Sequence, residues 1–287
     1  MNNIIRNIAT AITLISLCAS CVEDIDLDLS STEQRLVVEA FITTDTTYQQ
    51  VKLTLSGDYF DNQPMPAVSK AKVTISTDDQ IVELVESEIT PGVYVTPTEF
   101  YGRNGKTYHL SINNVDINKD GVQETYTADS YLPRVLYGDS IALDYNNTWK
   151  VWQILLFAKD PQDEINFYMF RALLNDQLLT ETLSSTEIAD DEFFDGNDIN
   201  GVWVYGWDND DDRMVTGDKV TLEMCTINEV FFEYLAALDE ETEAKNPLFS
   251  GAPANVPGNI SNNALGIFTT YGVSRLSVLS KKNLEDY

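Results

Sequence analysis

The stretch Leu36-Val-Val-Glu-Ala-Phe-Ile-Thr43 decides the fold class, because it opens a series of short runs rich in Val, Ile, Thr and Tyr. Residues of these types favour β-strands, and the segments between the runs contain turn signals such as Gly-Asp, Thr-Pro-Gly and Asn-Gly. The later runs are Gln49–Leu55, Ala71–Ser76, Ile81–Val85, Gly92–Val95, Thr107–Ile112 and Glu124–Ser130. Seven strands in about a hundred residues predict a β-sandwich of immunoglobulin-like or transthyretin-like type over residues 35–135.

The following residues, 136–287, predict a second antiparallel β domain with one packed helix, so the fold class is all-β. Two β-type runs flank the turn sequence Asp160-Pro-Gln-Asp-Glu164 and predict a hairpin with a wide turn. The expected strands of this half are Trp149–Lys159, Asn166–Leu174, Gly201–Trp207, Lys219–Thr226, Leu265–Tyr271 and Arg275–Val278.

One segment has a helical period, from about residue 227 to residue 244. Thr226 and Glu229 form a Ser/Thr-x-x-Glu capping box at its start, and Asn246-Pro247 cannot continue a helix. Its apolar residues fall on one face, which we expect to lie on a sheet. These residues are Ile227, Val230, Phe231, Tyr234, Leu235 and Leu238.

The N-terminus has the pattern of a bacterial lipoprotein leader. The apolar run Ile8–Leu17 is long enough for a signal peptide and too short to span a bilayer. Ala19 and Ser20 supply small residues just before Cys21, which predicts a signal peptide over residues 1–20 and lipidation of Cys21. An ordinary secretory signal peptide that is cleaved nearby is the alternative.

The acidic residues after Cys21 resemble the surface-export signal of Bacteroidetes lipoproteins, and residues 21–34 read as a tether to the first domain. We therefore expect a lipid-anchored protein of the outer membrane, exposed on the cell surface.

The chain is strongly acidic, with a formal net charge of −28. Removal of the leader deletes one basic residue and no acidic one, which leaves 17 basic against 46 acidic residues and a charge of −29. Such a field repels nucleic acid and anionic lipid, so a nucleic-acid partner is not expected. A cationic partner or divalent cations fit the charge, but solubility through self-repulsion is the favoured explanation.

With Cys18 removed and Cys21 acylated, Cys225 is the last thiol, and no intrachain disulfide is expected. Its place in a strand-like run favours a small buried apolar residue over a nucleophile.

Several motifs, taken in order, resemble the Bacteroidetes lipoprotein family known as domain of unknown function 4249. They are Leu36–Thr43, Ala71–Ile75, Gly105–Leu110, Asp160-Pro161 with Asn166-Phe-Tyr168, Gly217–Val220, and Asn246-Pro247 with Asn259–Phe268. The sequence differs from the family pattern at Ala40, where Gly is usual, and at Asn263, where Asn-Gly-Ala is expected. The resemblance implies a cell-surface lipoprotein that often accompanies TonB-dependent transporters, and it implies no catalytic residues.

Two acidic segments are candidates for calcium. Asp116-Ile-Asn118-Lys-Asp120-Gly121 matches the first six positions of a calcium loop, but Thr127 stands at position twelve, and a plain hairpin turn is the favoured interpretation. The second segment contains Asp208, Asp210 and Asp212, at the end of a region of ten carboxylates without Lys or Arg. A solvated loop is the favoured interpretation of that region, and calcium is the main alternative.

Trp203, Tyr205 and Trp207 alternate along one expected strand, and we expect them in the core, with an open ligand-stacking face as the alternative.

The only histidine, His109, has no partners for a zinc site or a hydrolase triad. We therefore expect no enzyme, but a binding or accessory partner of a TonB-dependent outer-membrane transporter in nutrient capture. The alternative is a surface hydrolase that acts on glycan or peptide through a carboxylate pair within Glu187–Asp212.

Overall fold

A computed structural model describes residues 34–57, 64–179, 182–183, 186–192, 195–208, 214–242 and 256–281 of the 287-residue chain. All of them belong to one compact unit. About half of the described residues are in strands (50%) and few are helical (7%), which confirms the predicted all-β class with one packed helix. No helix in these ranges is long and apolar enough to cross a bilayer.

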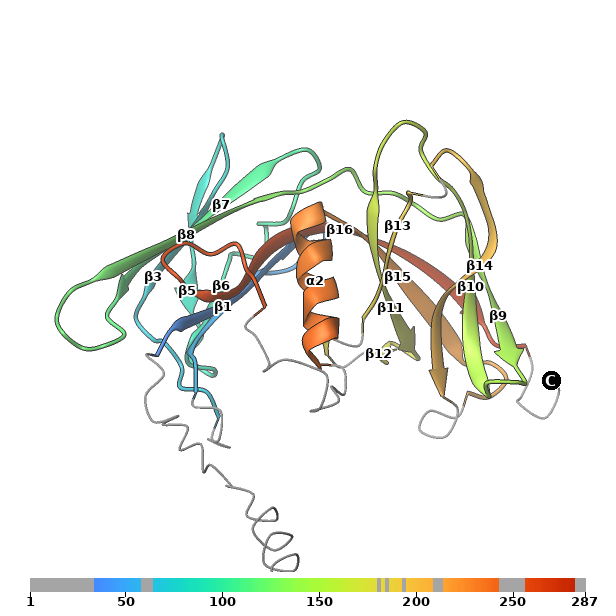
Figure 1. Cartoon of the computed structure of the whole chain (residues 1–287), viewed down its shortest axis with the longest axis horizontal. Coiled ribbons are helices and arrows are strands. Elements are labelled where there is room, and N and C mark those ends of the chain that lie inside the picture. Colours follow the sequence, from blue (N-terminus) through green and yellow to red (C-terminus); the bar gives the residue numbers. More distant parts are fainter. Residues whose placement is uncertain are drawn as a thin grey trace, which may run out of the picture. The chain divides into compact units, whose positions relative to one another are not determined.

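The largest sheet has nine strands and runs through both halves of the chain (Figure 1). Its order is β12-β11-β15-β16-β1-β2-β6-β5, with β13 paired to β11. The strands are β1 (Leu36–Thr43), β2 (Gln50–Leu55), β5 (Val85–Glu86), β6 (Val93–Val95), β11 (Phe167–Leu174), β12 (Gln177–Leu178), β13 (Glu187–Asp190), β15 (Lys219–Ile227) and β16 (Leu265–Leu279).

The long strand β16 joins the two halves of this sheet. It pairs in parallel with β1, from Val37 opposite Leu265, and antiparallel with β15, from Thr226 opposite Gly272. The sequence predicts two strands here, and the structure has one, because Gly272, Val273 and Ser274 continue the ladder without a turn.

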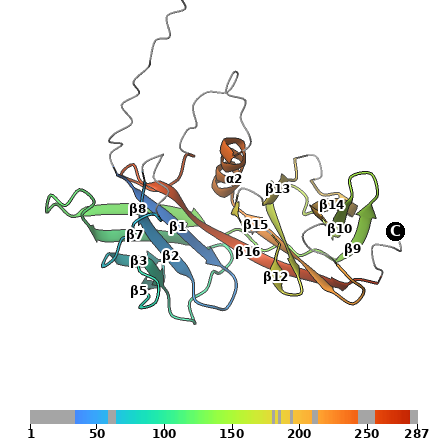
Figure 2. The same ribbon diagram turned by 90° about the horizontal axis from the view of Figure 1, so that it is seen from below.

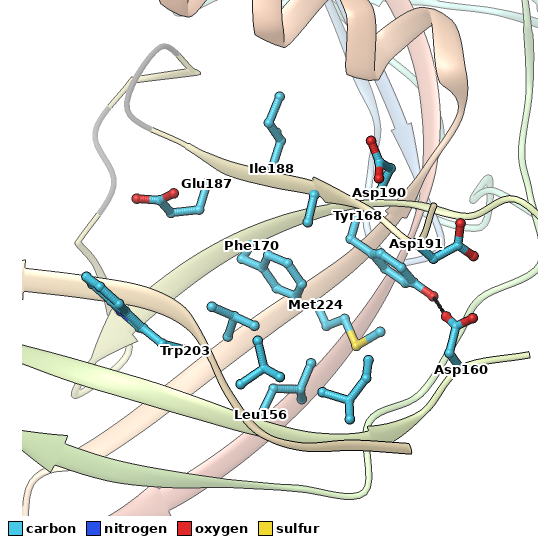
Figure 3. Close-up of a pocket in the computed structure, with 14 residues that line it drawn as sticks. Leu156, Asp160, Tyr168, Phe170, Glu187, Ile188, Asp190, Asp191, Trp203 and Met224 are labelled. Atoms are coloured by element: carbon cyan, nitrogen blue, oxygen red, sulfur yellow. Dashed lines mark hydrogen bonds between the residues drawn. The ribbon is translucent and has the colours of Figure 1, made fainter. Parts of the chain in front are cut away.

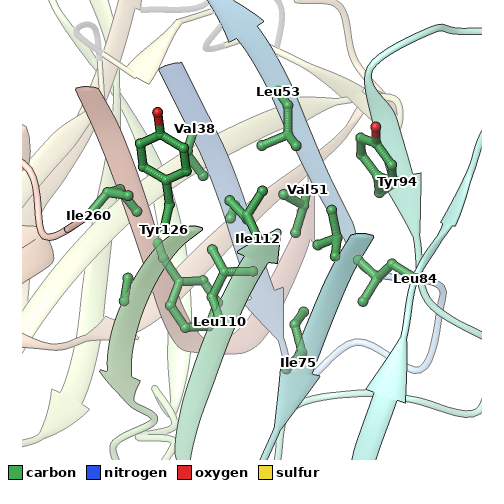
Figure 4. Packing of buried hydrophobic residues seen from close by; sticks show 14 of the residues in the cluster. Val38, Val51, Leu53, Ile75, Leu84, Tyr94, Leu110, Ile112, Tyr126 and Ile260 are labelled. Atoms are coloured by element: carbon green, nitrogen blue, oxygen red, sulfur yellow. The ribbon is translucent and has the colours of Figure 1, made fainter. Parts of the chain in front are cut away.

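The first half of the sheet packs on a four-stranded sheet with the order β4-β3-β7-β8. Its strands are β3 (Lys72–Ser76), β4 (Ile81–Glu83), β7 (Thr107–Val115) and β8 (Glu124–Tyr131). Alternate residues of the facing strands point inward and form one core, which includes Val38, Leu53, Ile75, Leu110 and Tyr126 (Figure 4). This packing gives a β-sandwich, and its core also takes in Ile260, Ala264 and Phe268 from the C-terminal part of the chain.

The second half of the sheet packs on a three-stranded sheet with the order β14-β10-β9. These strands are β9 (Ser140–Asn146), β10 (Val151–Lys159) and β14 (Asp198–Asp208). The predicted hairpin between β10 and β11 is wrong, because β10 pairs with β9 and β14 while β11 pairs with β12, β13 and β15. The segment after Asp160 instead carries the chain from one sheet to the other, and apolar residues of both strands meet in the core between them.

The helix α2 (Glu229–Thr242) lies on one side of β15 and β16 (Figure 2). Its cap differs from the predicted capping box. Strand β15 continues through Ile227, the hydroxyl of Thr226 accepts a hydrogen bond from the Leu136 amide, and the side chain of Asn228 accepts one from the Phe231 amide at 3.0 Å. Asn228 is therefore the N-cap residue. Phe231 and Leu235 pack into the core under the helix, as their spacing predicts.

The proposed boundary near residue 135 stays a prediction. The leader, Cys21 and the acidic tether up to Glu33 lie outside the described residues.

Candidate ligand-binding site

A cavity of about 160 Å³ lies at the edge of the second sandwich, and fourteen residues line it (Figure 3). Its apolar part is formed by residues that include Leu156, Phe170 and Met224, which also belong to the core between the sheets. Four lining residues are acidic and none is basic. The acidic ones are Asp160, Glu187, Asp190 and Asp191.

The pairing of β13 with β11 explains how carboxylates come to line an apolar cavity. Ala189 lies opposite Tyr168 and Glu187 lies opposite Phe170, and side chains of directly opposite residues share a face of the sheet. Glu187 and Ala189 therefore lie on the face that meets the three-stranded sheet. Burial raises the pKa of Glu187, and the negative charge of Asp239 on α2 raises it further.

A β-bulge in β14 exposes one of the three aromatic residues that the sequence places in the core. Tyr205 lies opposite Ile154 and Trp203 lies opposite Leu155, so Val204 is an extra residue that interrupts the alternation. Tyr205 and Trp207 are buried as predicted. The prediction is wrong for Trp203, which is 44% exposed and lines the cavity.

Trp203 stacks loosely on a second exposed tryptophan. The rings of Trp203 and Trp149 lie 5.4 Å apart between centroids, and Trp149 is 61% exposed. A Cβ atom at Gly206 would lie 3.0 Å from the indole of Trp203, so glycine lets the ring lie close to the strand. The alternative of an open aromatic surface therefore fits Trp203, together with Trp149, which the sequence does not single out.

Asp160 is buried at 2% exposure at the inner end of the cavity. One carboxylate oxygen accepts a hydrogen bond from the Tyr168 hydroxyl at 2.8 Å, and the other accepts one from the Gly196 amide at 3.1 Å. Burial raises the pKa of Tyr168, and its hydrogen bond to Asp160 raises it further. The hydroxyl therefore keeps its proton and stays a donor to Asp160.

Asp191 is also 2% exposed, but only half of its carboxyl group is satisfied. Its Oδ2 accepts a hydrogen bond from the Asn166 amide at 2.9 Å. Its Oδ1 is buried and has no hydrogen-bond partner in the described part of the chain. Burial raises the pKa of Asp191 from its ordinary value of 3.8 against the lowering by that amide, and the charge of nearby Asp160 adds to the increase.

The first calcium candidate forms the turn between β7 and β8. Asp116 accepts hydrogen bonds from the amides of Asp120 and Gly121, and Asn118 accepts one from the Asp120 amide. Lys119 and Gly121 have positive φ angles of 58° and 87°, so these side chains support a tight turn in a hairpin. Calcium binding there stays a prediction.

In the second candidate, Asp208 ends β14, whereas Asp210 and Asp212 lie outside the described residues. Among the residues that the structure describes, no group of three His, Cys, Asp or Glu side chains is placed to hold a metal. Calorimetric titration of the chelator-stripped protein tests both segments.

Cys225 is fully buried in β15, and burial raises the pKa of its thiol to about 12. A thiol of such pKa is a poor nucleophile at neutral pH, in agreement with its interpretation as a packing residue.

Fold and cavity together define a class: a β-rich protein with one helix, whose second sandwich has an acidic and aromatic cavity at its edge. A family profile described as domain of unknown function (DUF4249) matches residues 22–277. The chain belongs to this family, as its motifs indicate. A comparison with curated proteins gives no match.

Proposed function

We propose that the chain is a surface-exposed, lipid-anchored lipoprotein of the outer membrane that binds nutrient as a non-catalytic accessory partner of a TonB-dependent transporter. The lipoprotein leader pattern supports the location at the outer membrane, and the family resemblance supports the transporter as partner. The observation that carries the binding role is the cavity beside Trp203, since a recess with an apolar wall and a few polar groups is the usual form of a small-ligand site.

A surface hydrolase is the second candidate, because Glu187 and Asp191 line one cavity and both have raised pKa values. Their spacing argues against it. Four residues along an extended strand span about 13 Å, and glycosidase carboxyl pairs lie about 5–9.5 Å apart.

Co-purification separates the two candidates. The full protein, tagged at its C-terminus and extracted from membranes with detergent, should bring down an outer-membrane transporter. Recovery of the lipoprotein alone, together with substrate cleavage that disappears in Glu187→Gln or Asp191→Asn, would establish the hydrolase instead.

The proposed lipid anchor and surface exposure can be tested separately from the function. Mass spectrometry should find lipid on Cys21, and protease added to intact cells should digest the protein. The variant Cys21→Ser is the control and should lose both the lipid and the membrane fraction. An unmodified Cys21 in the wild-type chain, or complete protection from the protease, contradicts the proposed address.

A further inference from the structure

The cavity holds two buried carboxyl groups without a cation. Asp160 and Asp191 make no ion pair with Lys, Arg or His among the described residues. Burial of a charge is costly unless a counter-charge or hydrogen bonds replace the lost water. Asp160 has two donors, but Oδ1 of Asp191 has none. A cationic donor that reaches Oδ1 would meet a carboxylate oxygen that folding has already removed from water, so only the hydration of the donor itself is lost on binding.

The rest of the cavity fits an alkyl chain. Leu156, Phe170 and Met224 lie between the two ends in Figure 3, with Glu187 and Trp203 at one end and Asp160 and Asp191 at the other. The volume of about 160 Å³ is close to that of apolar cavities of ~150 Å³ that hold one benzene molecule. The cavity therefore has room for a single side chain, not for a whole oligomeric nutrient.

The mouth also favours a positive charge. Glu187 adds a carboxylate, and the exposed indole of Trp203 offers a face for a cation–π contact. A lysine or arginine side chain has the matching pattern, since its apolar stem packs on apolar surface while its charged head seeks a polar partner.

We propose that this cavity binds a lysine or arginine side chain of an exogenous peptide, with the stem against Leu156, Phe170 and Met224 and the charged head at Asp191. The inference rests on the proposed binding function and specifies its ligand as a cationic peptide. A free alkylamine has the same chemistry and is the other source of such a group.

Calorimetric titration of the full mature lipoprotein in detergent tests the ligand class. The probes are the N-acetylated peptide amides of Leu-Lys-Leu and Leu-Arg-Leu, with Leu-norleucine-Leu, blocked in the same way, as a control of similar stem without charge and Leu-Glu-Leu as a control of opposite charge. We expect both controls to bind at least about tenfold more weakly, which corresponds to one charge contact of about 1.4 kcal/mol. Butylamine binding as tightly as the peptides would assign the site to free amines, whereas weaker binding assigns it to peptides.

Two isosteric variants locate the site. Asp191→Asn keeps an oxygen for the Asn166 amide but removes the charge, and Glu187→Gln removes the charge at the mouth. Asp191→Asn should weaken the binding of Leu-Lys-Leu about tenfold, and Glu187→Gln should weaken it less, since Glu187 lies about 13 Å from Asp191 along the strand. The matched control Glu88→Gln/Glu99→Gln removes two exposed charges elsewhere and should leave the affinity unchanged.

Equal affinity for Leu-Lys-Leu and Leu-norleucine-Leu, or unchanged affinity in both cavity variants, overturns the inference. The co-purification of the transporter does not depend on a peptide. The accessory role and the cationic ligand can therefore be refuted independently of each other. A chain that recovers the transporter but discriminates no peptide refutes the ligand class alone. A chain that binds Leu-Lys-Leu through Asp191 but recovers no transporter refutes only the accessory role.

Discussion

Glu223 carries a buried ion-pair network on the face of β15 opposite the cavity. Its carboxylate contacts Arg171 of β11 at 2.6 Å and Arg275 of β16 at 2.8 Å, so one side chain ties three neighbouring strands. Arg275 also binds Asp45 with two hydrogen bonds of 2.7 and 2.6 Å. A buried carboxylate needs such partners, and removal of one of them leaves part of its charge uncompensated.

The substitution Arg275→Ala should therefore lower the free energy of unfolding by about 2–3 kcal/mol, measured by urea denaturation at neutral pH. The matched control is Arg134→Ala, whose partner Glu164 is exposed, and its cost should stay below about 1 kcal/mol. If both variants lose the same free energy of unfolding, the buried network stabilises the fold no more than a single exposed ion pair does.

The raised pKa of Asp191 makes the stability of the fold depend on pH with a sign opposite to that for a carboxylate in an ion pair. Because its pKa is raised in the folded protein, the folded state retains a proton that the unfolded chain has lost. This group therefore favours folding fully below pH 3.8, and its contribution is lost as pH rises through the raised pKa. Asp45 behaves in the opposite way, since hydrogen bonds from Arg275 lower its pKa and its contribution is lost as pH falls below 3.8.

Asp191→Asn should accordingly raise the melting temperature at pH 7, and the gain should shrink as the pH approaches 3.8. Thermal unfolding at several pH values measures it, with the exposed change Glu88→Gln as the control of equal charge. A variant that is less stable than wild type at pH 7 would mean that the carboxylate has a donor which the structure does not describe.

At the scale of elements, Asn228 connects the helix to the end of strand β8. Its Oδ1 caps α2, while its Nδ2 donates to Ser130 at 3.1 Å and to the carbonyl of Tyr131 at 3.2 Å at the end of β8. Thr226, the cap that the sequence suggests, is used by the Leu136 amide instead.

Asn228→Asp keeps the cap and loses the amide donor, whereas Asn228→Ala loses both. We expect Asn228→Ala to cost about 2 kcal/mol in chemical denaturation and Asn228→Asp about half as much. Glu229→Gln tests the predicted capping box and should cost only a few tenths of a kcal/mol, since only the dipole interaction of the first turn is lost. If Glu229→Gln lowers the free energy of unfolding more than Asn228→Ala does, the capping box that the sequence predicts is correct after all.

The family pattern near β16 also has a physical reason at this scale. Asn262 and Asn263 both have φ angles of 57°, a left-handed conformation that Asn tolerates and Gly adopts freely. Position 263 can therefore hold either Asn or Gly. Asn259 then pairs with β16 like a strand residue, since its side chain binds the amide and the carbonyl of Phe268.

The sequence predicts strands where period-two patterns are strong, and it predicts their partners poorly. The bounds of β1 agree with the prediction residue for residue, because its inward positions are all apolar. The partner of β10 is wrong, because a turn sequence such as Asp160-Pro161 fits a crossing between sheets as well as a hairpin. The candidate site depends on such partners: the bulge that exposes Trp203 and the register that places Glu187 opposite Phe170 are set by tertiary pairing. The acidic run next to aromatic residues within Glu187–Asp212 is the signal that the sequence offers for part of the cavity lining.

At the scale of the whole molecule, β16 contributes to all three cores. Phe268 belongs to the first sandwich, Ile267 and Tyr271 to the core under α2, and Leu276 and Val278 pack against the second sandwich. A strand that continues through three cores couples their stabilities, because it cannot leave one sheet without straining the next.

This coupling predicts a single unfolding transition for both sandwiches. A destabilising substitution near the start of β16 tests it when unfolding is followed by a signal from the second sandwich. All four tryptophans, Trp149, Trp152, Trp203 and Trp207, lie in or beside β10 and β14, so tryptophan fluorescence reports on the second sandwich. Gly266 lies beside β1 in the first, where a Cβ atom would lie 2.0 Å from the carbonyl oxygen of Val38. Gly266→Ala should therefore strain the first sandwich and lower the melting temperature by about 2–4 °C for each kcal/mol lost.

If β16 couples the cores, the fluorescence transition should move by as much as the far-UV circular dichroism transition, and both should stay single and coincident. Gly57→Ala is the matched control, since a Cβ atom there meets nothing within 4 Å and should change neither curve. A fluorescence transition that stays in place while the circular dichroism curve splits would show that the sandwiches unfold independently. That result would support two domains divided near residue 135, whereas a shared shift makes the nine-stranded sheet the unit that folds.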